Sequence, residues 1–406
     1  MTAMTEATQA SAPNPMAAVG DEGLRLFFPL AAVQAALWPF IWVVVDRLDM
    51  PLATDLPPGL WHANEMIFGA FGAALIGFIT TAVPEWTDTP RLRGKPLFAL
   101  AAVWSAARIV GFLGADAMQL VAAIADTAWL LALLLYAGSV SWRKRSANLL
   151  GFLVWLAALL ALCAATRGAF LADEVLAAQE ALWLAGLAFL GLLGVALARI
   201  TVPVTNLVLD PSERTSPFRP HPGRRNLASG LIAVLIVGEI AGLSDTVLAY
   251  LFIAAGAAFL DRTGESFIGR QTFRTEILCL SGSSLMAGAG LLLVGASRLG
   301  APFPDVPALH LALMGGLGLG VLTVFSIAGL LHTGRPLGIP FGGRVALVLL
   351  VVAVGTRVLP DLGVVPQLPG PPYAIASTIW AASFLLWLKT YWPYLSDLRS
   401  PGEHKC

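Results

Sequence analysis

Two apolar stretches of this chain carry histidines that could bind a cofactor, and the first surrounds His62. In the stretch WHANEM, His62 and Glu65 are three residues apart, which places them on one face of a helix. Gly69 and Ala73 follow on the face of His62, so another helix or a flat cofactor can approach it closely. The spacing suits a metal ion or the edge of a haem. The alternative is that both side chains hydrogen-bond across helices and only fix their packing.

The second stretch carries His310 at its start and His332 at its end. A helix rises about 1.5 Å per residue, so these histidines should be about 33 Å apart and cannot share one site. Two chemical regions are therefore expected, with His310 near His62 and His332 on the opposite side. Met314, one turn after His310, offers a thioether suited to copper or iron, although packing is the commoner role of a methionine.

The elements that must position these residues are membrane-spanning helices. Hydrophobic residues make up 57% of the 406 residues and charged residues only 12%, whereas soluble domains contain roughly 45–50% and 25%. The 25 basic and 25 acidic residues balance, so net charge gives no indication of a nucleic acid partner. The three cysteines form no CxxC pair, which argues against a zinc or disulfide framework.

Hydropathy predicts an all-α, polytopic membrane helix bundle of about twelve transmembrane helices, because a bilayer core needs about 20 apolar residues per helix. The expected spans are 27–45, 60–83, 97–114, 117–140, 147–166, 175–198, 226–243, 245–260, 276–297, 307–331, 343–359 and 372–392. One side of the membrane receives 20 of the 25 basic residues, 15 in alternate connections and five near the termini or span ends, which predicts that both termini are cytoplasmic.

The spans divide into two six-helix membrane halves, residues 27–200 and 226–392. Between them lies a cytoplasmic linker rich in proline and arginine, residues 201–225. A disordered cytoplasmic tail is expected over residues 1–26 and a second cytoplasmic tail over residues 393–406.

Ionisable residues within spans are further candidates, because each costs several kcal/mol unless it faces the bundle interior. Arg108 ends the third expected span, Asp126 lies within the fourth and Glu239 lies late in the seventh. All except Asp126 should lie at the periplasmic level with His62 and His310. If the protein reduces a substrate, Asp126, Glu65 and Glu239 are the expected proton carriers.

In order and spacing, several segments resemble the NnrS family, multi-pass bacterial membrane proteins described as containing haem and copper and linked to nitric oxide metabolism and nitrosative stress. The resemblance is carried by WHANEMIFGAFGAALIGFITTAVPEWT from Trp61, by Arg108 and Asp126, by ARITVPVTN from Ala198, by ALHLALMGGLGLGVLT from Ala308, and by HTGRPL from His332.

The resemblance implies twelve spans in a bacterial inner (cytoplasmic) membrane and two cofactors, haem and copper. It also implies that His62, His310 and His332 are haem or metal ligands and that Glu65 and Arg108 contribute to cofactor binding. The family pattern HAHEM reads HANEM here, with Asn64 in place of the second histidine. One or two histidines suffice for one haem, but a separate copper site loses a ligand.

These observations predict a haem-binding membrane protein of nitric oxide metabolism or nitrosative-stress resistance. Its partners would be nitric oxide or a nitrosylated metal species, a separate redox partner and the lipid bilayer, with no nucleic acid. Catalytic turnover, sensing and simple binding remain alternatives at this point. A second hypothesis is a twelve-span transporter of a metal, haem or metal–nitrosyl complex with the same histidines as transient ligands. A third is that the charged residues only hold helices together.

Overall fold

The computed structural model describes residues 15–397, and every regular element in that range is a helix. The first half comprises α1 (Pro15–Val19), α2 (Gly23–Phe40) with the π-helical η1 (Ile41–Val45), α3 (Pro58–Asn64) with π-helical η2 (Glu65–Phe71) and α4 (Gly72–Thr87), α5 (Lys95–Leu113), α6 (Gln119–Lys144), α7 (Leu150–Leu171) and α8 (Val175–Leu209). The second half comprises α9 (Arg224–Ile240), α10 (Asp245–Thr263), α11 (Thr275–Arg298), α12 (Asp305–His310) with π-helical η7 (Leu311–Gly318) and α13 (Leu319–Leu331), α14 (Phe341–Val358) and α15 (Ala374–Leu395). Short 3-10 turns join some of them.

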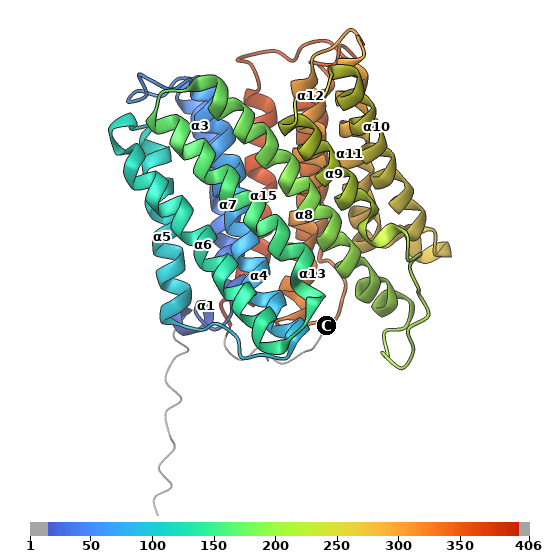
Figure 1. The fold of residues 1–406 in the computed structure, drawn as a ribbon. Coiled ribbons are helices and arrows are strands. Elements are labelled where there is room, and N and C mark those ends of the chain that lie inside the picture. The colour runs from blue at the N-terminus through green and yellow to red at the C-terminus, as the bar shows by residue number, and fades with distance from the viewer. Residues whose placement is uncertain (1–14, 398–406) are drawn as a thin grey trace, which may run out of the picture.

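These helices confirm a polytopic all-α membrane protein. Ten helical segments between residues 15 and 397 are long and apolar enough to cross a membrane. The two other expected spans are α9, which has 17 residues, and α15, where Lys389 and several aromatic residues dilute the aliphatic ones. Both run alongside the other helices of the bundle (Figure 1).

The two ends of the described chain meet at one end of the bundle. Arg25, near the start of α2, donates hydrogen bonds to the backbone carbonyls of Leu395 at 2.9 Å and Asp397 at 3.1 Å. An even number of crossings requires this arrangement. Residues 1–14 and 398–406, which hold most of the expected tails, lie outside the described residues.

Residues 15–26 differ from the disordered tail that the sequence predicts. They form α1 and the first turn of α2, and Glu22 and Arg25 are buried. The polar residues that suggest a disordered tail are instead ordered by distant helices. Glu22 contacts His332 at the end of α13, and Arg25 contacts Leu395 of α15. The linker also starts later than expected, since α8 continues to Leu209 through the apolar residues after Thr201.

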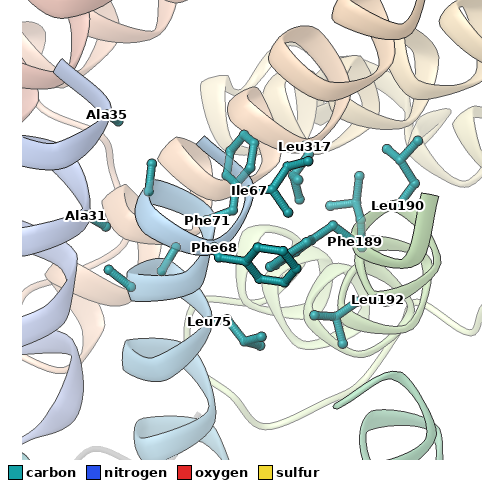
Figure 2. Close-up of a cluster of buried hydrophobic side chains, with 14 of the residues drawn as sticks. Ala31, Ala35, Ile67, Phe68, Phe71, Leu75, Phe189, Leu190, Leu192 and Leu317 are labelled. Atoms are coloured by element: carbon teal, nitrogen blue, oxygen red, sulfur yellow. The ribbon is translucent and has the colours of Figure 1, made fainter. Parts of the chain in front are cut away.

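The two histidine-bearing spans pack against α8 through an apolar core. Figure 2 shows Phe68, Phe71 and Leu75 of the second span beside Phe189 and Leu192 of α8, with Leu317 of η7 adjoining them. A glycine at 186 permits close approach, because a Cβ there would meet Leu313 of η7 at 3.4 Å and Ile67 of η2 at 4.0 Å. α8 therefore holds a span from each half of the chain in a fixed relation.

Candidate functional site

Three spans contain a π-helical segment, and two of these follow a candidate histidine. His62 lies three residues before η2, and His310 lies immediately before η7. The third segment, η1, contributes Trp42, whose indole stacks on the His62 imidazole with 4.3 Å between ring centroids and 15° between planes. A π-helical turn is rare and is frequent at functional sites. The structure thus places irregular backbone where the sequence predicts chemistry.

The helices α3 and α12, which carry His62 and His310, lie at the same end of the bundle (Figure 1). His310 and Arg357 of α14 are within electrostatic range of His62. The His310 Nδ1 lies 2.8 Å from the carbonyl oxygen of Val306, and because a carbonyl only accepts, Nδ1 carries the proton. The Nε2 lone pair of His310 is then free to bind a ligand. The Nδ1 of His62 is buried and has no hydrogen-bond partner within the described chain.

Glu65 belongs to a different cluster from His62. Its carboxylate accepts hydrogen bonds from Gln34 at 3.0 Å and Asn64 at 3.1 Å, and it lies 3.3 Å from the Arg108 guanidinium. The π-helical turn begins at Glu65, so the α-helical face that the spacing predicts for His62 and Glu65 is interrupted there. Glu65 and Arg108 are therefore placed to support the site through its scaffold.

Asp126 is the centre of this buried charge cluster. Its carboxylate accepts from Arg108 Nη2 at 2.6 and 2.7 Å, from Arg167 Nε at 3.0 Å and Nη2 at 2.5 Å, and from Trp129 Nε1 at 3.0 Å. The side chains of Glu65, Arg108, Asp126 and Arg167 are each at most 3% exposed. Two carboxylates face two guanidinium groups, so the buried charges balance, as buried ions require.

Glycines make room for the charge cluster. A Cβ at position 111 would lie 2.3 Å from the Glu65 carboxyl carbon, and one at position 69 would lie 2.6 Å from Arg108 Nη1. The helices α5 and η2 can therefore approach closely enough for Arg108 to reach Glu65. The sequence predicts that Gly69 shares a helical face with His62, whereas in the structure Gly69 lies against the Arg108 side chain.

Sequence reasoning missed Arg167 and Gln34 as members of this cluster. The expected fifth span stops at residue 166, one residue short of Arg167, whereas α7 runs to Leu171. A signal was present, because Asp126 in mid-span needs a basic partner and Arg167 is the basic residue at the end of the next span. Glu239, the other expected proton carrier, instead pairs with Arg298 at 2.8 Å.

His332 lies at the other end of the bundle from His310, since α12 and α13 end at opposite sides of it (Figure 1). Its Nδ1 is 2.9 Å from the Glu22 carboxylate and its Nε2 is 3.5 Å from the Glu85 carboxylate. Glu22 also lies 3.4 Å from the guanidinium of Arg91. The structure therefore surrounds His332 with carboxylates and does not bring it to His62 and His310.

The carboxylates around His332 set its protonation. Burial alone lowers the pKa of His332, but the hydrogen bond and charge of Glu22, with the charge of Glu85, outweigh burial and raise that pKa above its ordinary value of 6.5. A group whose pKa is raised by folding stabilises the fold fully below its unfolded pKa and loses that contribution as the pH rises through its folded pKa.

We expect Glu22→Gln to lower the thermal unfolding temperature most below about pH 6.5, the unfolded pKa of histidine. The difference in unfolding temperature between wild type and variant should narrow as the pH rises through the raised pKa of His332, because His332 then loses its charge. Thermal unfolding followed between mildly acidic and alkaline pH measures the gap. Glu213→Gln, in the exposed linker, is the matched control. A gap independent of pH would show that Glu22 stabilises only through Arg91.

The geometry defines a class of protein: a multi-pass, all-α membrane protein with a pair of imidazoles beside a buried and balanced charge cluster. Residues 15–397 contain no cluster of three or more histidine, cysteine or acidic side chains suited to a metal ion. Of the three predicted histidine ligands, His62 and His310 are on helices that reach the same end of the bundle.

A family model described as NnrS protein matches residues 18–399. The chain therefore belongs to the NnrS family, and the resemblance seen in its sequence is confirmed over nearly its whole length. Membership supports a membrane protein that acts in the nitric oxide response generally. No curated protein and no solved structure matches the chain.

Proposed function

We propose that this protein binds haem through His62 and His310 and acts in nitric oxide metabolism or nitrosative-stress resistance in the bacterial inner membrane. The observation that supports the proposal most is the state of the His310 ring. Histidines that bind a metal almost always donate their other ring N–H to a carbonyl or carboxylate. The Nδ1 of His310 does so with Val306.

The surroundings of His62 also fit a haem. Its Nδ1 is buried without a hydrogen-bond partner in the described chain, which is costly for an imidazole unless a ligand satisfies it. Trp42 stacks on the His62 imidazole and so restricts the rotation of that ring. Two imidazoles are enough for one haem iron. Copper would have to use the same imidazoles, with the thioethers of Met66 and Met314 one turn beyond each histidine.

When bound through one of these imidazoles with the other flanking it, haem would supply an iron that can take nitric oxide or exchange it with a nitrosylated metal species. The chain's own residues hold the imidazoles, exclude water and keep the neighbouring charges paired. Asp126 accepts five hydrogen bonds from two arginines and a tryptophan, so a proton there would remove the negative charge that both guanidinium groups face. Glu65, which shares its oxygens between two amides and one arginine, is the better proton carrier. Electrons would come from a separate redox partner.

The proposal is tested by the optical spectrum of the purified full-length protein, recorded oxidised, reduced and exposed to nitric oxide, with iron and copper quantified on the same sample. We expect a Soret band at near-stoichiometric iron that shifts with nitric oxide. Protein free of iron and copper that takes up no haem on reconstitution would overturn the proposal.

Transport is the second candidate, because π-helical segments interrupt the outer ends of three spans and broken helices are typical of transporter binding sites. Under this alternative, His62→Ala impairs the uptake of haem or metal into proteoliposomes. Uptake by wild type without stable haem retention would favour it.

A further inference from the structure

A cavity of about 710 Å³ opens beside His332, at the ends of α4, α8 and α13. We call it the His332 chamber. Its polar lining includes Glu85, Arg199, Asn206, Arg335 and His332. Its inner wall is apolar and includes Phe28, Phe78 and Val324. Neither His62 nor His310, the two residues proposed above to hold haem, lines the chamber, so it is a separate site.

A narrow apolar cavity of about 70 Å³ adjoins the inner wall of the chamber. The two cavities share Phe28, Phe78, Ile200 and Val324, and every residue that lines the narrow one is apolar. The narrow cavity extends along the core shown in Figure 2 as far as Phe71 and Leu317. A wide polar chamber with a narrow apolar extension fits a ligand that has a polar head and an apolar tail.

The charges of the chamber favour an uncharged head. Its lining holds three arginines and three carboxylates, namely Arg199, Arg274, Arg335, Glu85, Asp210 and Glu213, together with His332, whose charge is matched by Glu22 outside the lining. Arg274 is also paired with Glu276 at 3.4 Å. A phosphate headgroup requires a clear excess of positive charge. The balanced lining instead suits a neutral group that accepts and donates hydrogen bonds.

The inner rim of the chamber presents both kinds of hydrogen-bonding group. Arg199 offers N–H donors, and Glu85 offers acceptor oxygens beside the His332 imidazole. Phe78 packs edge to face on Trp86 with 5.7 Å between ring centroids and adds aromatic surface to the lining, while the Arg199 guanidinium lies over the Trp86 ring. Carbonyl oxygens of a ring would accept from the guanidinium, and its hydroxyls would donate to the carboxylate.

We propose that the His332 chamber binds the ring of an isoprenoid quinone or quinol and that the narrow cavity receives the start of its tail. Such molecules are lipid-soluble, uncharged and flat, with oxygen atoms on opposite edges of the ring. The site stands independently of haem at His62 and His310, because it uses other residues at the other end of the bundle.

The test uses the full-length protein in lipid nanodiscs with a photoreactive azido-quinone. We expect cross-links in the segments 78–86 and 324–337, and we expect unlabelled short-tailed quinone to suppress them. Ala328→Trp fills the inner wall and should weaken quinone binding about tenfold or more, a change equivalent to at least about 1.4 kcal/mol. Val352→Trp, on an exposed face of α14, is the matched control and should leave binding unchanged. Glu85→Gln should weaken binding of the quinol more than that of the quinone.

Cross-links on lipid-facing helices that Ala328→Trp leaves unchanged would overturn the proposal. So would tightly bound phospholipid extracted from the purified protein that quinone does not displace, because the chamber would then hold a charged headgroup. Competition in the wild-type protein decides the matter even if Ala328→Trp fails to fold.

Discussion

Asp126→Asn is expected to destabilise the protein by about 3–5 kcal/mol, the usual cost of removing one partner from a buried ion pair. The carboxylate of Asp126 accepts hydrogen bonds from both Arg108 and Arg167. An amide at this position removes the negative charge and turns one end of the side chain into a donor. Two guanidinium groups would then share the single charge of Glu65, which lies 3.3 Å from Arg108.

Thermal unfolding in detergent and the yield of folded protein measure this effect. The double variant Asp126→Asn with Arg167→Gln removes one charge of each sign, so it should be more stable than the sum of the single changes predicts. Glu180→Gln, at an exposed position of α8, should have almost no effect. If Asp126→Asn is as stable as wild type, the balance of charges in this cluster does not contribute to the stability of the fold.

His62→Ala and His310→Ala should each reduce the haem content of the purified protein to near background while leaving the fold intact. Both imidazoles lie outside the Asp126 cluster, so removing one leaves the buried ions paired. The readouts are the haem-to-protein ratio and the unfolding temperature of haem-free protein. His221→Ala, in the exposed linker, is the control that should keep the wild-type ratio.

The two readouts separate binding from packing. Loss of haem with an unchanged unfolding temperature supports ligation. A lowered unfolding temperature with unchanged haem content would mean that the histidines hold helices together and that the iron is elsewhere.

Most of the fold follows from local properties of the sequence. Each of the twelve expected spans coincides with a helical segment, because long apolar runs can satisfy their backbone groups in a bilayer only as helices. The placement of His62 and His310 at the same end of the bundle was also predictable, since alternating topology places the starts of the second and tenth spans on one side.

The partners of the charged residues could not be predicted in the same way. Glu22 contacts His332, which is 310 residues away along the chain, and Gln34 contacts Glu65 across a helix pair. Such contacts depend on which helices are neighbours, and hydropathy does not encode the order of helices around a bundle. For the same reason the apparent pair of His62 and Glu65 divides between two clusters.

The π-helical segments determine how the insertion or deletion of a residue would affect the two histidines. A π-helical turn holds one extra residue, and one residue corresponds to about 100° of rotation about a helix axis. The part of the second span before η2 is therefore rotated relative to α4, which follows η2. Gain or loss of one residue at the start of η2 or η7 would turn His62 or His310 to a new direction and leave α4 or α13 in register. The ends of these spans that carry the histidines can thus acquire a new binding geometry by single-residue insertion or deletion, while the rest of the bundle remains the same.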